Sequence, residues 1–289
     1  HALIASNTSA LPITELAEAS VRPANFIGMH FFSPADKMPL VEIICGEQTG
    51  DEALAAAFDL AQQLGKTPIV VNDGPGFFTT RVIGKTVSQG AQMVMEGIDP
   101  VLIEAAARAN GSPVGPLAAI DEISQETAYR NGLQMKLDAE ARGETWQEQP
   151  AGELVRRMVE EFGRKGRRSG GGYYEYPEGG KKRIWPGLKQ HFAPNGFKQV
   201  PFEDIKDRLV FSQCIEAVRA MQEGVITSVA DGNIGSIMGI GFPPYTGGSA
   251  QYIVGYEGAL GTGKAAFVAR AKELAAKYGD RFTPPDSLL

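Results

Sequence analysis

The sequence predicts an α/β segment followed by two related all-helical modules, and three observations support this fold class. Short apolar runs alternate with helical patterns over residues 1–73, which is typical of an α/β sheet. Beyond residue 73, helical periodicity dominates the chain. Arg81 and Arg208 each precede a Glu-Gly pair by fifteen residues, and each pair is followed by another helix and a Gly/Pro turn. Two such copies indicate a duplicated helical module, because a solenoid needs more repeats.

The elements of the α/β segment follow from short apolar runs and helix end signals. Strands are expected where such runs are rich in β-branched or aromatic residues, at Leu3–Ala5, Phe26–Phe32, Val41–Cys45 and Pro68–Val71. A helix is expected to begin near Ser9. A second helix covers Asp51–Leu64 and ends at Gly65, because glycine is a common C-terminal cap.

Longer helices are expected after the turn Asp73-Gly-Pro-Gly. Their apolar spacing places them at Phe77–Glu96, Pro100–Asn110, Ile123–Ala141, Ala151–Phe162, Phe202–Glu223, Ser228–Met238, Gln251–Tyr256 and Gly263–Tyr278. The stretch from Pro177 to Pro201 is rich in Pro, Gly and Lys, which predicts a linker.

Composition excludes several classes of protein. The chain has 289 residues, of which 43% are hydrophobic and 21% charged, as in ordinary globular proteins. The 28 Lys and Arg are scattered among 34 Asp and Glu, and this balance argues against a nucleic-acid partner. No apolar run approaches the roughly 18 residues of a membrane span. Cys45 and Cys214 lie in apolar stretches without CxxC spacing, which indicates a reduced compartment and neither a disulfide framework nor a metal site.

His30 and Glu42 are lone titratable residues inside otherwise apolar strands. A buried carboxylate without a partner costs several kcal/mol, so Glu42 is expected to have one. The segment Ser33–Pro39, with prolines at both ends, is suited to turn the chain and bring the two strands together. A His–Glu pair would then form, in which the carboxylate orients the ring as a general base. The alternatives are a satisfied core histidine and a glutamate that faces solvent at a strand end.

Small polar residues follow the first strand and open the long helix after Gly-Pro-Gly. Ser6-Asn-Thr-Ser would face the crevice at the carboxyl ends of parallel strands, where ligands bind. The same residue types are common helix caps, and both roles can hold at once. Thr79 and Thr80 have the same two alternatives, in the first turn of a helix whose N–H groups are free.

Two further features concern phosphate binding. The basic stretch Arg164–Arg168 either binds phosphates or forms a solvated loop, and His191 is predicted to lie on the surface. No Gly-x-Gly-x-x-Gly motif follows a strand.

An ordered set of motifs resembles the L-3-hydroxyacyl-CoA dehydrogenase family. These motifs are Ser6-Asn-Thr-Ser-Ala-Leu, Gly28-Met-His-Phe-Phe-Ser-Pro, Met38-Pro-Leu-Val-Glu-Ile-Ile, Asp73-Gly-Pro-Gly-Phe and the Gly-rich stretch from Gly163 to Tyr174. The second helical module, with Gly232-Asn-Ile-Gly-Ser-Ile-Met-Gly, is similar to the multifunctional α-subunits of fatty-acid β-oxidation, including the trifunctional enzyme α-subunit. The resemblance covers essentially the whole chain.

The resemblance implies hydride transfer between NAD and a 3-hydroxyacyl-CoA. His30 matches the catalytic histidine, which takes the proton from the 3-hydroxyl, and Glu42 matches its carboxylate partner. Ser9 matches a catalytic serine that hydrogen-bonds the substrate oxygen, and Asn7 lies in the same turn on the cofactor side. Ser33 falls on the cofactor side as well.

Two positions depart from the commonest family pattern. The family usually has Asn where this chain has Ser33, and again where it has Thr80. The trifunctional α-subunit branch is similar to this chain at both positions, which indicates a subfamily trait. Thr80 as a ligand of the substrate oxygen is in question, since threonine reaches less far than asparagine.

The resemblance also implies a division into segments. Residues 1–73 match the C-terminal part of a Rossmann-type NAD-binding domain, 74–177 a first helical dehydrogenase domain and 202–289 a second, with 178–201 as a linker. The chain is thereby expected to be truncated at its N-terminus, without the strands and Gly-rich turn that hold the NAD pyrophosphate.

We therefore expect this polypeptide alone to bind NAD weakly or not at all. A titration with NADH followed by its fluorescence tests this expectation. Saturation in the micromolar range would contradict it.

Alternative functions and partners remain open on the sequence alone. One alternative is a non-catalytic helical fragment that serves dimerisation or acyl-CoA docking, and another is a different NAD-linked hydroxyacid dehydrogenase. The resemblance implies a homodimer or a complex with a thiolase subunit for a full-length enzyme. The acidic balance, with no visible leader, favours the bacterial cytoplasm, with the mitochondrial matrix as the alternative.

Overall fold

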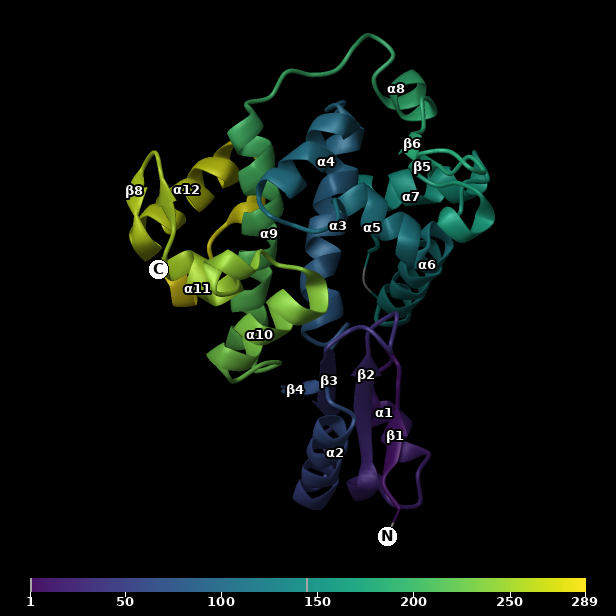
Figure 1. The fold of residues 1–289 in the computed structure, drawn as a ribbon, viewed down its shortest axis with the longest axis vertical. Helices are drawn as coiled ribbons and strands as arrows, with labels where there is room; N and C mark the ends of the chain where they lie inside the picture. Colours follow the sequence, from purple (N-terminus) through teal and green to yellow (C-terminus); the bar gives the residue numbers. More distant parts are fainter. Residues whose placement is uncertain (1, 144) are drawn as a thin grey trace. The chain divides into compact units, whose positions relative to one another are not determined.

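A four-stranded sheet forms the core of the N-terminal region (Figure 1). The computed structural model describes residues 2–143 and 145–289. The strands lie in the order β1 (Ile4–Ser6), β2 (Phe26–Phe31), β3 (Leu40–Cys45) and β4 (Thr67–Asn72). β1 pairs with β2 and β3 with β4 in parallel, whereas β2 and β3 are antiparallel. All four strands agree with the sequence prediction to within one residue at either end.

The two faces of this sheet bury different residues because side chains alternate along a strand. Ile27 and Met29 of β2, with Val41 and Ile43 of β3, pack against helix α2 (Asp51–Gln63) through its alanines. Leu40 and Ile44 point to the opposite face, where they join a second apolar cluster with helix α1 (Ile13–Glu18). Helix α10 (Val229–Ile240) also contacts β3 and β4. His30 and Glu42 alternate with the first set and thus belong to the α10 face.

The remaining elements are mainly helices. The other helices are α3 (Thr79–Met95), α4 (Pro100–Ala109), α5 (Pro116–Ile123), α6 (Gln125–Ala141), α7 (Pro150–Glu160), α8 (Gly187–Phe192), α9 (Phe202–Gln222), α11 (Ser249–Val254) and α12 (Gly263–Tyr278). Two short hairpins pair β5 (Tyr174–Glu175) with β6 (Arg183–Ile184) and β7 (Glu257–Gly258) with β8 (Gly261–Thr262). None of the helices in the described part is long and apolar enough to cross a membrane.

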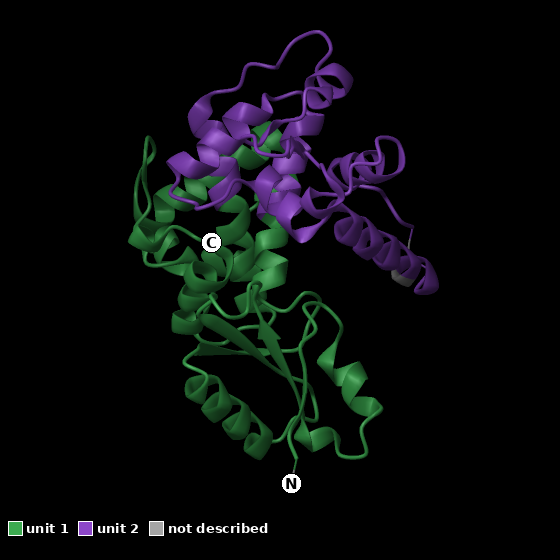
Figure 2. Cartoon of the chain, turned by 45° about the vertical axis from the view of Figure 1, so that its right-hand side comes forward, with its two compact units in different colours: residues 1–85, 211–289 green, residues 86–210 purple. Residues whose placement is uncertain are grey.

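The chain divides into two compact units that cut across the expected segments (Figure 2). One unit contains residues 1–85 and 211–289, and the other contains residues 86–210. The boundaries fall inside α3 and α9, so each of these helices contributes to both units. The sheet therefore shares its unit with the C-terminal helices.

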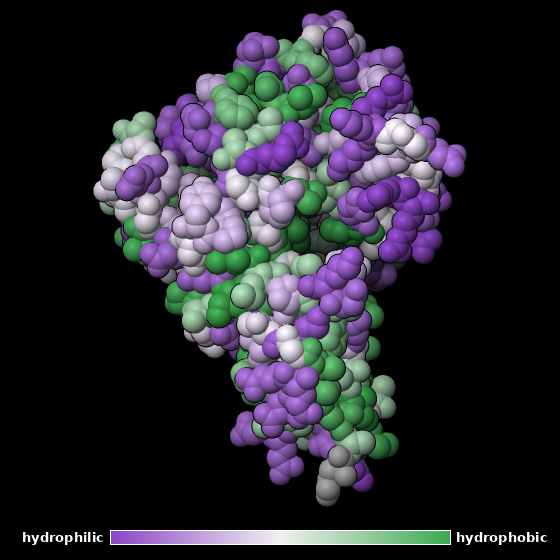
Figure 3. All heavy atoms as spheres, in the orientation of Figure 1, coloured by the Kyte–Doolittle hydropathy of each residue, from purple (hydrophilic) through white to green (hydrophobic). Residues whose placement is uncertain are grey.

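The outer edge of β4 is covered by the chain that follows α9. The backbone N–H of Asn72 donates to the Val225 carbonyl at 2.8 Å, and the Asn72 side chain donates to Gly224. The Val70 N–H donates to the Asp231 carboxylate at 3.1 Å. These bonds satisfy groups that an open sheet edge would leave available for aggregation. At the other edge, Ile4 of β1 and the nearby Leu11 are exposed hydrophobic residues. Figure 3 shows hydrophobic surface on the side of the sheet that carries β1.

Parts of the predicted linker and of the first helical region are more structured than expected. Helix α8 and strand β6 lie within residues 178–201, and Leu188 of α8 is buried. Their Pro- and Gly-rich composition resembles that of loops, so the pattern gave no helix signal. The separate helix α5 was also not predicted, because its apolar residues lie just beyond Pro116 in a Gly/Pro turn.

The repeated Arg and Glu residues form reciprocal ion pairs. Arg81 binds the carboxylate of Glu223 with two nitrogens, at 2.5 and 2.9 Å, and also binds Glu216. Arg208 binds Glu96 in the same two-pronged way, at 2.7 and 2.8 Å. The arginine of each repeat thus pairs with the glutamate of the other. The hydrogen bonds to Glu223 are the main reason why the pKa of Arg81 is raised further above its usual value.

Replacing Arg208 by Met is expected to lower the free energy of unfolding by about 3 kcal/mol, because it removes the oppositely charged, two-pronged partner of Glu96 at a fully buried position. Lys206→Met is the matched control, since Lys206 lies on the same helix in an exposed pair with Glu203 and should cost less than about 1 kcal/mol. Urea denaturation followed by circular dichroism measures both. Equal losses would show that the Arg208 pair does not stabilise the fold.

Candidate active site

His30 and Glu42 are in direct contact on neighbouring strands. They occupy opposite positions of the antiparallel β2–β3 pair, and the Nδ1 of His30 lies 2.9 Å from the Oε2 of Glu42. Glu42 is fully buried, and His30 is only 7% exposed. The alternative of a solvent-facing glutamate at a strand end is thereby excluded. The structure brings together the two residues that the sequence analysis paired.

The Glu42 carboxylate accepts four hydrogen bonds. Its Oε1 accepts from the backbone N–H groups of Phe78 and Thr79, at 2.9 and 3.0 Å. Its Oε2 accepts from the Thr79 hydroxyl at 2.5 Å and also contacts the His30 ring. These donors come from the start of α3, where free N–H groups and the positive end of the helix dipole favour a negative charge. The burial of this carboxylate is therefore compensated by hydrogen bonds.

The His30 ring lies among aromatic side chains. Its centroid is 4.5 Å from that of Phe32 and 6.4 Å from that of Phe77. Because a carboxylate only accepts, the neutral ring carries its proton on Nδ1 and leaves a lone pair on Nε2. This arrangement is suited to accept a proton at Nε2 of a largely buried ring.

The loop after β1 is fixed beside the strand that carries His30. The Oδ1 of Asn7 accepts a hydrogen bond from the Phe31 N–H at 2.9 Å. The Thr8 hydroxyl accepts from the N–H groups of Ala10 and Leu11 and closes a local turn, whereas helix α1 begins later, after Pro12, and has no side-chain cap. Ser9 is exposed. The parallel strands β1 and β2 have their carboxyl ends at the same end of the sheet, and His30 lies near this end of β2.

Ser33 and Thr80 are near the pair in sequence but are not bonded to it. Ser33 is exposed in the turn between β2 and β3, and Thr80 is half-buried in the first turn of α3. Within the described residues, neither side chain hydrogen-bonds to His30 or Glu42. Thr79, which the sequence analysis weighed only as a cap beside the crevice, holds the carboxylate instead. The only available signal was a hydroxyl residue at a helix start, which does not specify its partner.

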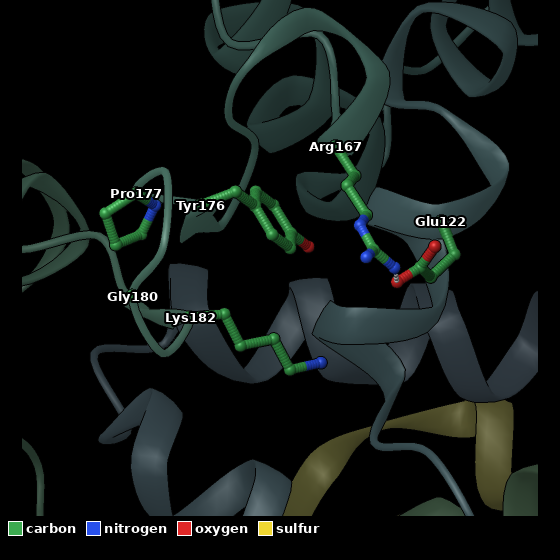
Figure 4. Close-up of a pocket in the computed structure, with 6 residues that line it drawn as sticks. All are labelled: Glu122, Arg167, Tyr176, Pro177, Gly180 and Lys182. Atoms are coloured by element: carbon green, nitrogen blue, oxygen red, sulfur yellow. Dashed lines mark hydrogen bonds and ion pairs between the residues drawn. The ribbon is translucent and has the colours of Figure 1, made fainter.

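Two surface hollows lie away from the pair. One is lined by Glu122, Arg167, Tyr176, Pro177, Gly180 and Lys182. In it Arg167 and Glu122 face each other and pair at 2.6 Å, while Lys182 extends along another side (Figure 4). The pairing neutralises Arg167, which favours the solvated-loop interpretation of the basic stretch. Burial and the nearby Asp121 raise the pKa of Tyr176, so its hydroxyl stays protonated.

The second hollow lies beyond the carboxyl ends of β3 and β4. Its lining includes Glu15, Glu47, Asp51 and Asp73, and none of the predicted site residues. No group of three or more possible metal ligands occurs in the described part of the chain.

Comparisons with known proteins agree with this fold. Residues 1–74 match the family model of the 3-hydroxyacyl-CoA dehydrogenase NAD-binding domain, and residues 76–176 match that of the C-terminal domain. (S)-3-hydroxybutyryl-CoA dehydrogenase PaaH1 from Ralstonia eutropha is 36% identical, with a TM-score of 0.54 over 61% of this chain and 60% of that one. The 3-hydroxybutyryl-CoA dehydrogenase from Escherichia coli is 22% identical, with a TM-score of 0.74 over 99% of this chain and 74% of that one.

A third structure is the dehydrogenase part of multifunctional enzyme 1 from C. elegans. It is 23% identical, with a TM-score of 0.66 over 98% of this chain and 63% of that one. The chain therefore spans about three fifths of the Ralstonia and C. elegans chains and about three quarters of the Escherichia coli chain.

The Rossmann-like sheet, the helical region and the matched NAD-binding domain define an NAD-dependent dehydrogenase. The two family matches together span more than half of the sequence. The chain belongs to the 3-hydroxyacyl-CoA dehydrogenase family.

The residues that follow β1 are polar, as the binding of a dinucleotide cofactor requires. The Asn7–Phe31 bond places exposed polar residues after β1 next to the strand that carries His30. The crevice at the carboxyl ends of parallel strands is where dinucleotides bind in this type of sheet.

Proposed function

We propose that the chain carries the dehydrogenase site that oxidises L-3-hydroxyacyl-CoA to 3-ketoacyl-CoA in fatty-acid β-oxidation. The observation that carries this proposal is the buried His30–Glu42 pair, which lies at the end of the sheet where strands β1 and β2 finish. The names of the solved relatives support the substrate class, since two of them are 3-hydroxybutyryl-CoA dehydrogenases.

The chemistry assigns one task to each residue of the pair. His30 accepts the proton of the substrate 3-hydroxyl at Nε2 as the carbon–hydrogen bond at C3 breaks. Glu42 holds the ring in the Nδ1–H tautomer and stabilises the positive charge that forms on the imidazole. When bound, NAD supplies the acceptor for the hydride that leaves C3. The aromatic rings of Phe32 and Phe77 limit water around His30.

The neighbouring polar residues complete the proposed site. We assign Asn7, Ser9 and Ser33 to the cofactor side. Asn7 accepts a hydrogen bond from Phe31, the residue after His30. Ser9 follows Asn7 closely in the sequence, Ser33 follows His30 closely, and both serines are exposed. Ser9 and Thr80 are assigned to the substrate oxygen. These assignments rest on the family pattern of the matched motifs.

We further propose that the chain is part of a multifunctional β-oxidation α-subunit with two related helical modules. The reciprocal pairs Arg81–Glu223 and Arg208–Glu96 support two equivalent modules. The fold that 98% of this chain shares with the dehydrogenase part of a multifunctional enzyme supports its place in such a subunit. In such a protein the partners would be a second copy or a thiolase subunit.

The reduction of acetoacetyl-CoA with NADH by the complete gene product in which this chain occurs tests the proposed function. We expect turnover with the CoA ester. An inactive protein that still self-associates would instead support a docking role for the helices. Turnover of a free hydroxyacid without turnover of its CoA ester would support a different hydroxyacid dehydrogenase.

A further inference from the structure

Thr79 is the side-chain donor that shares an oxygen of Glu42 with His30. Its hydroxyl lies 2.5 Å from Oε2, the same oxygen that contacts the Nδ1 of His30. Because an ionised carboxylate has no hydrogen to give, the hydroxyl donates and the oxygen accepts. Thr79 is fully buried, as is Glu42.

The two oxygens of Glu42 are held in different ways. Oε1 is held by the backbone N–H groups of Phe78 and Thr79, which every amino acid except proline provides. Oε2 is held by the Thr79 hydroxyl and His30 alone among the described contacts. The backbone fixes where the carboxylate lies, whereas the hydroxyl fixes the rotation of its plane toward the imidazole.

The methyl group of Thr79 meets helix α10. A Cβ atom placed on Gly239 would lie 3.3 Å from the Thr79 Cγ2 and 2.6 Å from the Leu40 Cδ2. A side chain at position 239 would therefore crowd the Thr79 methyl, and glycine leaves it room. The hydroxyl and the methyl therefore have separate neighbours, so substitutions can separate their roles.

We propose that Thr79 is a positioning residue that orients the Glu42 carboxylate, and through it the His30 base, for the reaction assigned to this site. This inference rests on the proposed function but adds a residue that touches neither substrate nor cofactor. Thr79 affects the rate only through the His30–Glu42 contact.

Thr79→Val and Thr79→Ser test this role as a pair. Valine keeps the methyl packing and removes the hydroxyl, whereas serine keeps the hydroxyl and removes the methyl. We expect Thr79→Val to lower kcat about tenfold, since small errors in catalytic geometry are costly, with the KM for acetoacetyl-CoA unchanged. Thr79→Ser should retain most of kcat. An unchanged kcat in Thr79→Val, or equal losses in both variants, would overturn the proposal.

A second arm uses His30→Gln as the background. If Thr79 acts through the dyad, Thr79→Val adds no further loss of rate once His30 is absent. A further tenfold loss in that background would show that Thr79 acts by another route and would overturn the proposal.

The third arm does not depend on turnover. The Nδ1–H proton of His30, observed by NMR, should shift in Thr79→Val and stay near its original position in Thr79→Ser. An unchanged resonance in Thr79→Val would overturn the role of Thr79. Failure of the proposed function appears separately, as absence of turnover in the unsubstituted protein.

Discussion

His30→Gln is expected to lower kcat for acetoacetyl-CoA reduction about a thousandfold. Glutamine can fill the space of the ring and form hydrogen bonds, but it cannot exchange a proton with the substrate oxygen near neutral pH. General acid–base catalysis by a positioned side chain contributes roughly 10²- to 10⁴-fold, and the loss should fall in this range. Steady-state kinetics of the complete gene product measure it.

His191→Gln is the matched control for this prediction. His191 lies on α8 in a different part of the chain, is exposed, and its ring is tilted against that of Phe162. We expect its kcat to equal that of the unsubstituted protein. If His30→Gln retains more than about a tenth of the rate, His30 is not the general base.

Glu42→Gln should be the second most damaging substitution. The groups around Glu42 donate hydrogen bonds to its carboxylate, namely the N–H groups of Phe78 and Thr79 and the Thr79 hydroxyl. Glutamine replaces one acceptor oxygen by an amide nitrogen, which itself donates. At least one buried group then loses its acceptor, which costs about 2 kcal/mol of unfolding free energy. The imidazole also loses the charge that stabilises its protonated form, so we expect kcat to fall about a hundredfold.

Glu47→Gln provides the control, because Glu47 is an exposed glutamate just beyond the end of β3. Its substitution should change neither stability nor kcat. Urea denaturation and steady-state kinetics are measured on both variants. A Glu42→Gln protein with unchanged rate and stability would contradict the role assigned to the carboxylate.

The pairing of His30 with Glu42 could be predicted because the signal is local. Each residue is a lone titratable group in an apolar strand, and a Pro-bounded turn joins the two strands. Alternation along β2 and β3 then places both on one face of the sheet. The strand positions were predictable for the same reason, since each is a short apolar run with polar or Pro/Gly flanks.

The rest of the site could not be predicted because it depends on contacts between distant residues. The start of α3 reaches Glu42 from 36 residues further along the chain. Nothing in Thr79 distinguishes a residue that caps its own helix from one that binds a distant carboxylate. The pairing of Arg81 with Glu223 and of Arg208 with Glu96 could not be predicted for the same reason. The repeat indicates which positions are equivalent but not which residues they contact.

The protonation of His30 tests the central claim most directly. In a ¹⁵N-labelled sample at a pH where the ring is neutral, the two ring nitrogens have distinct chemical shifts, and His30→Gln assigns the signals. We predict that Nδ1 carries the proton, bonded to Glu42, and that Nε2 is bare. A ring with its proton on Nε2 would contradict the assignment of His30 as a base held by Glu42.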